Sequence, residues 1–384
     1  MCACGYLARS AANSGVVQTR SPMLSRRITR MRRYSALVGY HFDFMHLDRM
    51  YATTVTRATT IDATKLRRVL LIMPYWLGDA VMVSPLFTAL KRHIPEVEID
   101  ALIADNLAEL VQHNPAISRV HRIGQAWRRS GVWKTLAPRL RLLRELRRRR
   151  YDVVIQPSDG SWGAALALML RIPYAVGVSA SAHRQPVKRF FWRHAFSHQH
   201  DLTPGHAVQN NLALLSSLGV HAPQEPMTMV PGASAAAAIA RRLQALDLSD
   251  FVLLAPTSSK SDFGLSGDQC RELLVRLTKR GERVIVTSAP VKQETDLIGS
   301  ATAGLDAIDL SGQLGLGELA ALVGKAKCAI CMDSGTMHLA AAMRTPVVAI
   351  FIKGNPIKTG PWQVKHRVVR SADQVIEAMR AIME

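Results

Sequence analysis

The stretch LIMPYWLGDAVMVSPLFTALK, residues 71–91, decides the fold class. It begins inside an apolar run over residues 68–73, passes through a loop that contains Gly78 and Asp79, and continues into a helical pattern over residues 81–92. A short apolar strand that turns through glycine into a helix is the first half of a βαβ unit, which builds parallel sheets. The sequence therefore predicts an α/β fold with a parallel sheet that contains this strand.

The same alternation of strand-like and helix-like segments continues along the chain and starts again after a proline-marked linker at residues 223–231. Before the linker we expect strands at 98–103, 119–123 and 151–155 and helices at 107–112, 133–150 and 207–218. After it we expect strands at 251–255, 283–287, 328–332 and 346–351 and helices at 233–246, 269–280, 316–324 and 337–343. The natural arrangement is two Rossmann-like, doubly wound domains, over residues 66–228 and 229–384, that face each other across a cleft. In such sheets, ligands bind at the carboxyl ends of the strands.

Length and composition exclude several classes of protein. The 384 residues are 48% hydrophobic and 20% charged, which suits two or three soluble globular domains of ordinary size. The longest apolar run, residues 162–170, is far shorter than the roughly 20 residues that a membrane-spanning helix needs. Five cysteines, spread unevenly, are typical of a chain from a reducing compartment and exclude a disulfide scaffold.

Positive charge is concentrated in the first half of the chain. The whole chain carries 49 basic and 29 acidic residues, a net charge of +20, and residues 232–384 hold 18 and 15 of them. Residues 1–231 therefore carry a net charge of +17, which indicates that this half meets an anionic partner. On charge alone, nucleic acid, an anionic membrane and an acidic glycolipid all remain possible partners.

Residues 1–65 differ from the rest of the sequence. They are rich in arginine, contain no acidic residue before Asp43, and show no sustained helix or strand period. Arginine-rich, serine-containing, acid-poor starts resemble transit peptides, and a disordered basic tail or a start codon placed too far upstream gives the same composition. We expect a basic, disordered extension over these residues.

A second strand–turn–helix segment, CAICMDSGTMHLAAAM at residues 328–343, carries the other candidate site. Its strand ends in Asp333, and Ser334 and Gly335 lead directly into a helix. Backbone N–H groups at such a helix start bind phosphate well, and a carboxylate at the strand end can accept hydrogen bonds from sugar hydroxyls. The same residues are equally typical of a helix N-cap, and the spacing around Asp79, taken alone, favours a carboxylate that stabilises a helix start.

Together the two segments resemble glycosyltransferase family 9, the heptosyltransferases that build the inner core of lipopolysaccharide. The family pattern of a strand, Gly-Asp and a helix ending in Leu-Lys is matched by Gly78-Asp79 and Leu90-Lys91. A second family pattern, Asp-Ser/Thr-Gly-x-x-His-Leu-Ala-Ala followed by Pro-Val-Val-Ala-Leu-Phe, is matched by DSGTMHLAA at 333–341 and PVVAIF at 346–351. The resemblance covers residues 67–375 and implies a GT-B fold.

The resemblance implies a role for each matching residue. Asp79 would be the general base that takes a proton from the acceptor hydroxyl, and Gly78 would support its loop. Ser334, Gly335 and the helix that they open would hold the donor pyrophosphate, with Asp333 on the heptose and His338 close by. The remaining donor-binding residues, placed more loosely near the phosphates and the nucleoside, would be Ser258, Ser259, Glu294 and Leu314.

One stretch departs from the family pattern. The family continues from the hydroxyl pair into Lys-x-Trp-Pro, whose lysine neutralises the leaving diphosphate, whereas this chain has FGLS at residues 263–266. Lys260 is either a substitute that reaches the same phosphates from a reshaped loop or a solvated loop lysine. The departure leaves the identity of the donor sugar open.

The predicted function is that of an inverting glycosyltransferase that moves heptose from ADP-heptose to a lipopolysaccharide core acceptor. Helix N–H groups and basic side chains would neutralise the diphosphate, so the resemblance implies no metal and no other cofactor. The acceptor would be an anionic glycolipid rather than nucleic acid, and the arginine-rich segments at 147–150 and 184–193 suit a peripheral contact with the cytoplasmic face of the membrane. The alternatives are a relative that uses another nucleotide sugar, a catalytically idle GT-B protein and a basic binding protein.

Overall fold

The computed structural model describes residues 60–124, 135–158, 161–179, 196–259 and 261–384. Residues 55–384 form one compact unit. The extension predicted over residues 1–65 lies outside the described part, except for residues 60–65. Those residues belong to the fold, because Ile61 is buried and its N–H donates a hydrogen bond of 2.8 Å to the carbonyl oxygen of Ser217. The prediction of a disordered extension is therefore wrong for its last residues.

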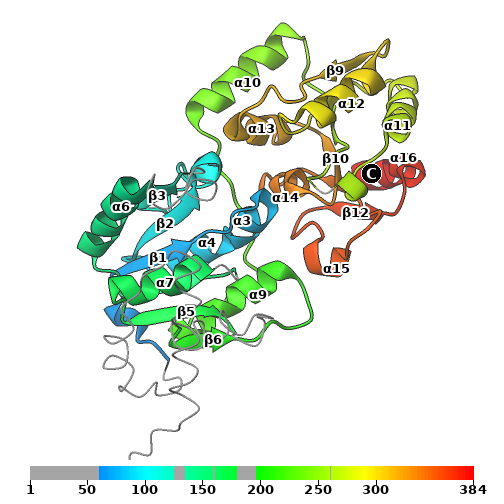
Figure 1. The fold of residues 1–384 in the computed structure, drawn as a ribbon. Coiled ribbons are helices and arrows are strands. Elements are labelled where there is room, and N and C mark those ends of the chain that lie inside the picture. Colours follow the sequence, from blue (N-terminus) through cyan, green and yellow to red (C-terminus); the bar gives the residue numbers. More distant parts are fainter. Residues whose placement is uncertain (1–59, 125–134, 159–160, 180–195, 260) are drawn as a thin grey trace, which may run out of the picture. The chain divides into compact units, whose positions relative to one another are not determined.

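The first half of the described chain forms a six-stranded parallel sheet in the order β3-β2-β1-β4-β5-β6 (Figure 1). Its strands are β1 (Arg68–Ile72), β2 (Glu98–Ala104), β3 (Arg119–Ile123), β4 (Val153–Gln156), β5 (Tyr174–Val178) and β6 (His198–His200). β1 is the strand predicted from the opening stretch. Strand order reverses between β1 and β4, and the carboxyl ends of strands at such a reversal are where doubly wound sheets bind ligands.

Helices and 3₁₀ segments cover both faces of this sheet. They are α3 (Leu77–Val83), α4 (Pro85–His93), η2 (Asp105–Leu110), α6 (Leu136–Arg149), α7 (Ser161–Leu170), α9 (Ala207–Ala213) and η5 (Leu214–Leu218). Val69 and Leu71 pack under α3, α4 and α9, whereas Leu70 packs under α6 on the opposite face. The helix predicted over 81–92 starts earlier and is broken at Ser84, because Pro85 has no N–H to continue the first helix and instead begins the second.

The second half repeats the architecture. Its six-stranded parallel sheet has the order β12-β11-β10-β7-β8-β9, which is the same topology as in the first sheet. The strands are β7 (Val252–Ala255), β8 (Val284–Val286), β9 (Ala307–Asp309), β10 (Cys328–Met332), β11 (Val347–Ile350) and β12 (His366–Val369). The main helices are α10 (Ala233–Ala245), α11 (Gly267–Lys279), α12 (Lys292–Thr302), α13 (Leu316–Val323), α14 (Gly335–Ala342), α15 (Pro356–Thr359) and α16 (Val375–Met383). Two doubly wound sheets confirm the predicted fold class, and the domain boundary near residue 229 stays a prediction.

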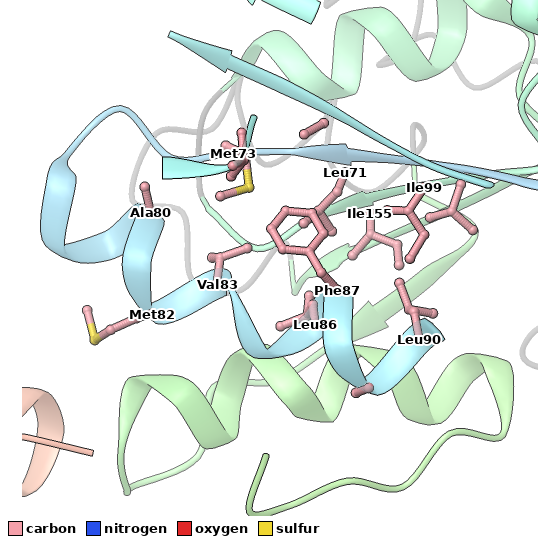
Figure 2. Packing of buried hydrophobic residues seen from close by; sticks show 14 of the residues in the cluster. Leu71, Met73, Ala80, Met82, Val83, Leu86, Phe87, Leu90, Ile99 and Ile155 are labelled. Carbon is pink, nitrogen blue, oxygen red and sulfur yellow. The ribbon is translucent and has the colours of Figure 1, made fainter. Parts of the chain in front are cut away.

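The core beneath β1 shows how the opening stretch folds. Figure 2 shows Leu71 of β1 and Phe87 and Leu90 of α4 in one buried cluster with Ile99 and Ile155 from the neighbouring strands. Burying a side chain such as Phe87 stabilises a fold by about 1.5–3 kcal/mol. The same cluster continues into α14 of the second half through Leu339 and Ala341, among other residues. The packing of α14 on α3 therefore joins the two strand–turn–helix segments that the sequence singled out.

Candidate active site

Asp79 lies in the first turn of α3, directly after the loop that follows β1. Trp76 is the N-cap residue of α3; its side chain makes no capping hydrogen bond and is 64% exposed. A carboxylate in a first helical turn is stabilised by the helix dipole, so this position fits the role of a helix-start residue. Asp79 is also exposed, which leaves its carboxylate accessible to a ligand hydroxyl at the carboxyl end of β1.

Two glycines allow α3 and α14 to lie close together. A Cβ atom on Gly78 would come within 2.8 Å of His338 Cδ2, and a Cβ atom on Gly335 would come within 2.7 Å of Leu77 Cδ2. Cβ atoms in proteins do not approach other atoms within 3.0 Å, so neither helix tolerates a side chain at these points without a shift. The turn that carries Asp79 therefore lies next to the turn that follows Asp333.

His338 is buried in this contact, with 4% of its surface exposed. Burial, with a smaller contribution from repulsion by His206, lowers the pKa of its imidazole to about 3. The ring is therefore neutral at physiological pH. A neutral, buried ring carries no positive charge to offer a phosphate, so His338 acts here as the packing partner of Gly78.

Asp333 follows β10, at the carboxyl end of the second sheet, and begins a turn into α14. Its carbonyl oxygen accepts a hydrogen bond from Ser258 Oγ at 3.2 Å, and its Oδ1 lies 3.5 Å from Thr359 Oγ1. Ser334 begins the helix without a side-chain capping bond, and its Oγ is buried with no hydrogen-bond partner within the described structure. A buried hydroxyl without a partner is costly, which suits an Oγ that a ligand satisfies.

The remaining predicted donor-binding residues lie in the loop after β7, in α12 and in the segment before α13. Ser258 contacts the Asp333 turn as described, whereas Ser259 is exposed and Lys260 lies outside the described residues. Glu294, in the first turn of α12, accepts a hydrogen bond of 2.6 Å from Thr257 Oγ1 and so lies beside this loop. Leu314 is partly buried and packs against the core of the second sheet.

A basic residue that the sequence reading missed lies at the same edge. Lys353, in the loop after β11, pairs with Asp262 of the loop after β7, with 3.0 Å between Nζ and Oδ2. The next residue, Gly354, has φ +96°, and a Cβ atom there would lie 2.5 Å from Asp333 Oδ2. The sequence offered one signal for Lys353, which is its position just beyond the predicted strand 346–351. The carboxyl ends of strands in a parallel sheet share one edge, so a lysine there lies at the ligand-binding edge.

His206 links the two halves beside this region. Its Nδ1 accepts a hydrogen bond from the N–H of Val208, and its Nε2 donates one of 2.9 Å to the carbonyl oxygen of Gly360. Burial lowers the pKa of His206, and its ring stacks on Trp362 with 4.6 Å between centroids. Trp362 Nε1 in turn donates a hydrogen bond to the carbonyl oxygen of Glu225. The loop after α15 is thereby attached to the start of α9.

Metal-binding clusters and membrane-spanning helices are both absent from the described residues. Within that part of the chain, no group of three or more histidine, cysteine, aspartate or glutamate side chains is arranged to hold a metal ion. No helix in the described ranges has the length and apolarity required to cross a membrane.

With this geometry in place, comparison with known proteins decides the family. Residues 139–381 match the sequence profile of glycosyltransferase family 9 (heptosyltransferase), and this range includes the Asp333 turn and all six strands of the second sheet. The chain belongs to glycosyltransferase family 9. The predicted family is confirmed, and with it the prediction of a glycosyltransferase.

Named relatives of this family 9 glycosyltransferase agree with the assignment. It is 28% identical over 290 residues to "Lipopolysaccharide heptosyltransferase 3" of Escherichia coli K12, an alignment that covers 74% of this chain and 82% of the relative. It is 26% identical over 327 residues to "Lipopolysaccharide heptosyltransferase 1" of Pseudomonas aeruginosa, which covers 77% of this chain and 81% of the relative. Both alignments span most of each relative.

Solved structures show the same fold. A family 9 glycosyltransferase from Veillonella parvula superposes with a TM-score of 0.74 at 18% identity, covering 85% of this chain and 99% of that one. The E. coli heptosyltransferase WaaC with ADP superposes with a TM-score of 0.68 at 21% identity, covering 82% of this chain and 99% of that one. The family 9 glycosyltransferase therefore has the GT-B fold that the resemblance implied.

Proposed function

We propose that this enzyme transfers heptose from ADP-heptose to the core of a lipopolysaccharide, with inversion at the anomeric carbon and with Asp79 as the general base. Support for donor and acceptor comes from the names of the relatives, which are lipopolysaccharide heptosyltransferases, and from the similar fold of the E. coli heptosyltransferase WaaC, which was solved with ADP. The observation that carries the chemistry is the close packing of α3 on α14, which brings the turns of Asp79 and Asp333 together.

In the proposed reaction, the acceptor hydroxyl oxygen attacks the anomeric carbon of the donor. The new C–O bond forms as the bond between that carbon and the diphosphate oxygen breaks, and ADP leaves with the electron pair. The hydroxyl proton passes to the carboxylate of Asp79. A positioned base of this kind accelerates such a step by about 10²–10⁴-fold.

We assign the donor to the second sheet. The N-terminus of α14 presents backbone N–H groups that have no partner inside the helix, and these favour a diphosphate. The buried Ser334 Oγ supplies a further hydrogen-bonding group at the same turn. Asp333, at the strand end, is assigned to the sugar hydroxyls, and Ser258 supports its turn from the neighbouring strand.

We assign the acceptor to the first, basic half, and the outer surface of α6 to an anionic membrane. Leu142 and Leu146 bury the inner face of α6 against the sheet. Its outer face exposes the side chains of Arg141, Arg144, Arg147 and Arg148 together with Leu140, which is 50% exposed. Arginines that surround an exposed apolar side chain suit the headgroup region of anionic lipid, which supports the proposal of a peripheral contact with the cytoplasmic face of the membrane.

A transfer assay tests the proposed function. The purified full chain is incubated with ADP-heptose and a delipidated, heptose-deficient core oligosaccharide, and ADP release and product mass are measured. We expect one heptose to be added per acceptor and ADP to be released in equal amount. Transfer from another nucleotide sugar but not from ADP-heptose would contradict the donor assignment, and failure with every nucleotide sugar would contradict the transferase proposal.

Nucleotide binding provides an independent test of the donor. A ligand present at 100 times its dissociation constant stabilises a protein by about 2.7 kcal/mol, which a thermal-shift titration detects easily. We expect ADP-heptose and ADP to raise the melting temperature more than the corresponding uridine and guanosine compounds do. A larger shift with a uridine or guanosine sugar would favour the alternative donor.

A further inference from the structure

The charge on a leaving diphosphate must be neutralised, yet the stretch in which the family pattern places a lysine has Phe263 at that position. The aromatic ring does not carry charge, so a cation must come from elsewhere in the fold. Loops that follow neighbouring strands of the sheet can supply it, because β11, β10 and β7 are adjacent and end at one edge.

The loop after β11 reaches the Asp333 turn directly. A Cβ atom on Gly354 would lie 2.5 Å from Asp333 Oδ2 and 3.3 Å from Phe263 Cε1. This glycine therefore contacts both the carboxylate that we assign to the donor sugar and the stretch, residues 263–266, that differs from the family pattern. Its φ of +96° lies in the region that favours glycine. Lys353 precedes this contact point and is therefore held at the edge of the proposed donor site.

The ammonium group of Lys353 spans two loops. Its Nζ lies 3.0 Å from Asp262 Oδ2, so the side chain crosses from the loop after β11 to the loop after β7, on either side of β10. The side chains of Lys353 and Asp262 are 53% and 70% exposed. Exposed ion pairs of this kind hold their partners weakly, so a diphosphate can take the place of Asp262.

We propose that Lys353 is the cation that faces the donor diphosphate in this chain, and that Asp262 is its counter-ion when no nucleotide is bound. The inference rests on the proposed function, because it specifies how the same site binds its donor. Lysine acts on phosphate as a point charge, so its effect depends on the number of phosphates it faces.

The test compares two nucleotides that differ by one phosphate. Dissociation constants of ADP and AMP are measured by calorimetry for the full chain and for Lys353→Ala, Lys353→Arg and Asp262→Asn, at one fixed ionic strength. We expect Lys353→Ala to weaken ADP binding at least about tenfold and AMP binding much less. Lys353→Arg, which keeps the charge, is expected to retain most of the wild-type affinity for ADP. Asp262→Asn removes a negative charge beside the diphosphate and is expected to tighten ADP binding.

A matched control has the same change of charge at the opposite edge of the sheet. Lys279 is exposed and ends α11, which leads into the amino end of β8, so Lys279→Ala is expected to leave ADP affinity unchanged. The inference would be overturned if Lys353→Ala left ADP affinity unchanged or lowered the affinities for ADP and AMP equally. It would also be overturned if Asp262→Asn weakened ADP binding as much as Lys353→Ala does. In those cases the wild type still binds ADP, and the proposed function stands. A wild-type chain that does not bind ADP would overturn both.

Discussion

His338 Cδ2 lies 2.8 Å from the point where a Cβ atom on Gly78 would be. The two residues stand far apart in the sequence, and each belongs to one of the two family motifs. Their contact places the backbone of the Asp79 turn directly on a buried, neutral imidazole. The position of the proposed base therefore depends on a residue of the opposite half of the chain.

Substitution of Gly78 tests this contact. Gly78→Ala places a methyl group against the His338 ring, and overpacking of this kind costs about 1–3 kcal/mol. We expect a lower free energy of unfolding and a turnover that falls by more than the loss of folded protein explains, because the Asp79 turn is displaced. Gly267→Ala is the control, since a Cβ atom on Gly267 meets no atom within 4 Å. If both variants behave alike, the contact does not position the base.

The role of Asp79 is tested by Asp79→Asn, which keeps the size of the side chain and removes its basicity. We expect turnover to fall by about 10²-fold or more, with ADP affinity and melting temperature almost unchanged. A residue that only stabilises the helix start would show the reverse, a loss of roughly 1 kcal/mol in stability with turnover retained. Asp268→Asn, at an exposed first-turn position of α11, is the control and is expected to keep full turnover.

Asp333→Ala tests the assignment of this carboxylate to the donor sugar. We expect ADP-heptose to bind at least about tenfold more weakly, while ADP, which lacks the sugar, loses much less affinity. Calorimetric titration with both ligands measures the difference. Asp306→Ala, which removes an exposed carboxylate before β9, is the control. Equal losses of affinity for ADP and ADP-heptose would indicate that Asp333 supports the phosphate-binding turn and does not bind the sugar.

Stability at acidic pH depends on Asp100, a fully buried carboxylate of β2. Burial alone would raise its pKa, but hydrogen bonds from His121, Arg149 and Tyr151 lower it from 3.8 to about 2. Because the folded-state pKa is below the unfolded one, Asp100 stabilises the fold above pH 4, and this contribution of about 2 kcal/mol is lost as the pH falls from 4 to 2. Denaturant unfolding at several pH values should show this loss in the wild type. Asp100→Asn should be less stable at pH 7 and show a smaller loss on acidification.

Charge reversal on α6 tests the proposed membrane contact. The triple variant Arg144→Glu, Arg147→Glu and Arg148→Glu is expected to lose most of its binding to vesicles that contain anionic lipid. Wild-type binding should weaken as ionic strength rises, because salt screens exposed charges beyond about 10 Å at 0.1 M. The control reverses the exposed Lys279 and Arg280 of the second half. Equal binding of the wild type to neutral vesicles, or a preference for duplex DNA, would contradict the glycolipid and membrane assignment.

Local pattern determined much of the fold. Strands β1 to β4, β7, β8, β10 and β11 and the turns that follow β1 and β10 were predicted, because an apolar run between turn residues is a property of neighbouring positions. β5, β6, β9 and β12 were not predicted. β6, for example, reads His-Gln-His and is a strand because it pairs with β5 rather than because of its own residues.

Tertiary structure decided which members of a sequence pattern carry which role. The arginine run at the end of α6 has a single chemical character in the sequence, yet the side chain of Arg149 is 13% exposed in ion pairs with Asp100 and Glu98, whereas Arg147 and Arg148 are exposed. Likewise, the sequence shows that the lysine of the family pattern is absent from residues 263–266. Only the structure shows that Lys353, from the loop after β11, lies at the same edge of the sheet and pairs with Asp262. Spacing along the chain determines strands, helices and turns, whereas burial and contact between distant strand ends depend on how the sheets pack.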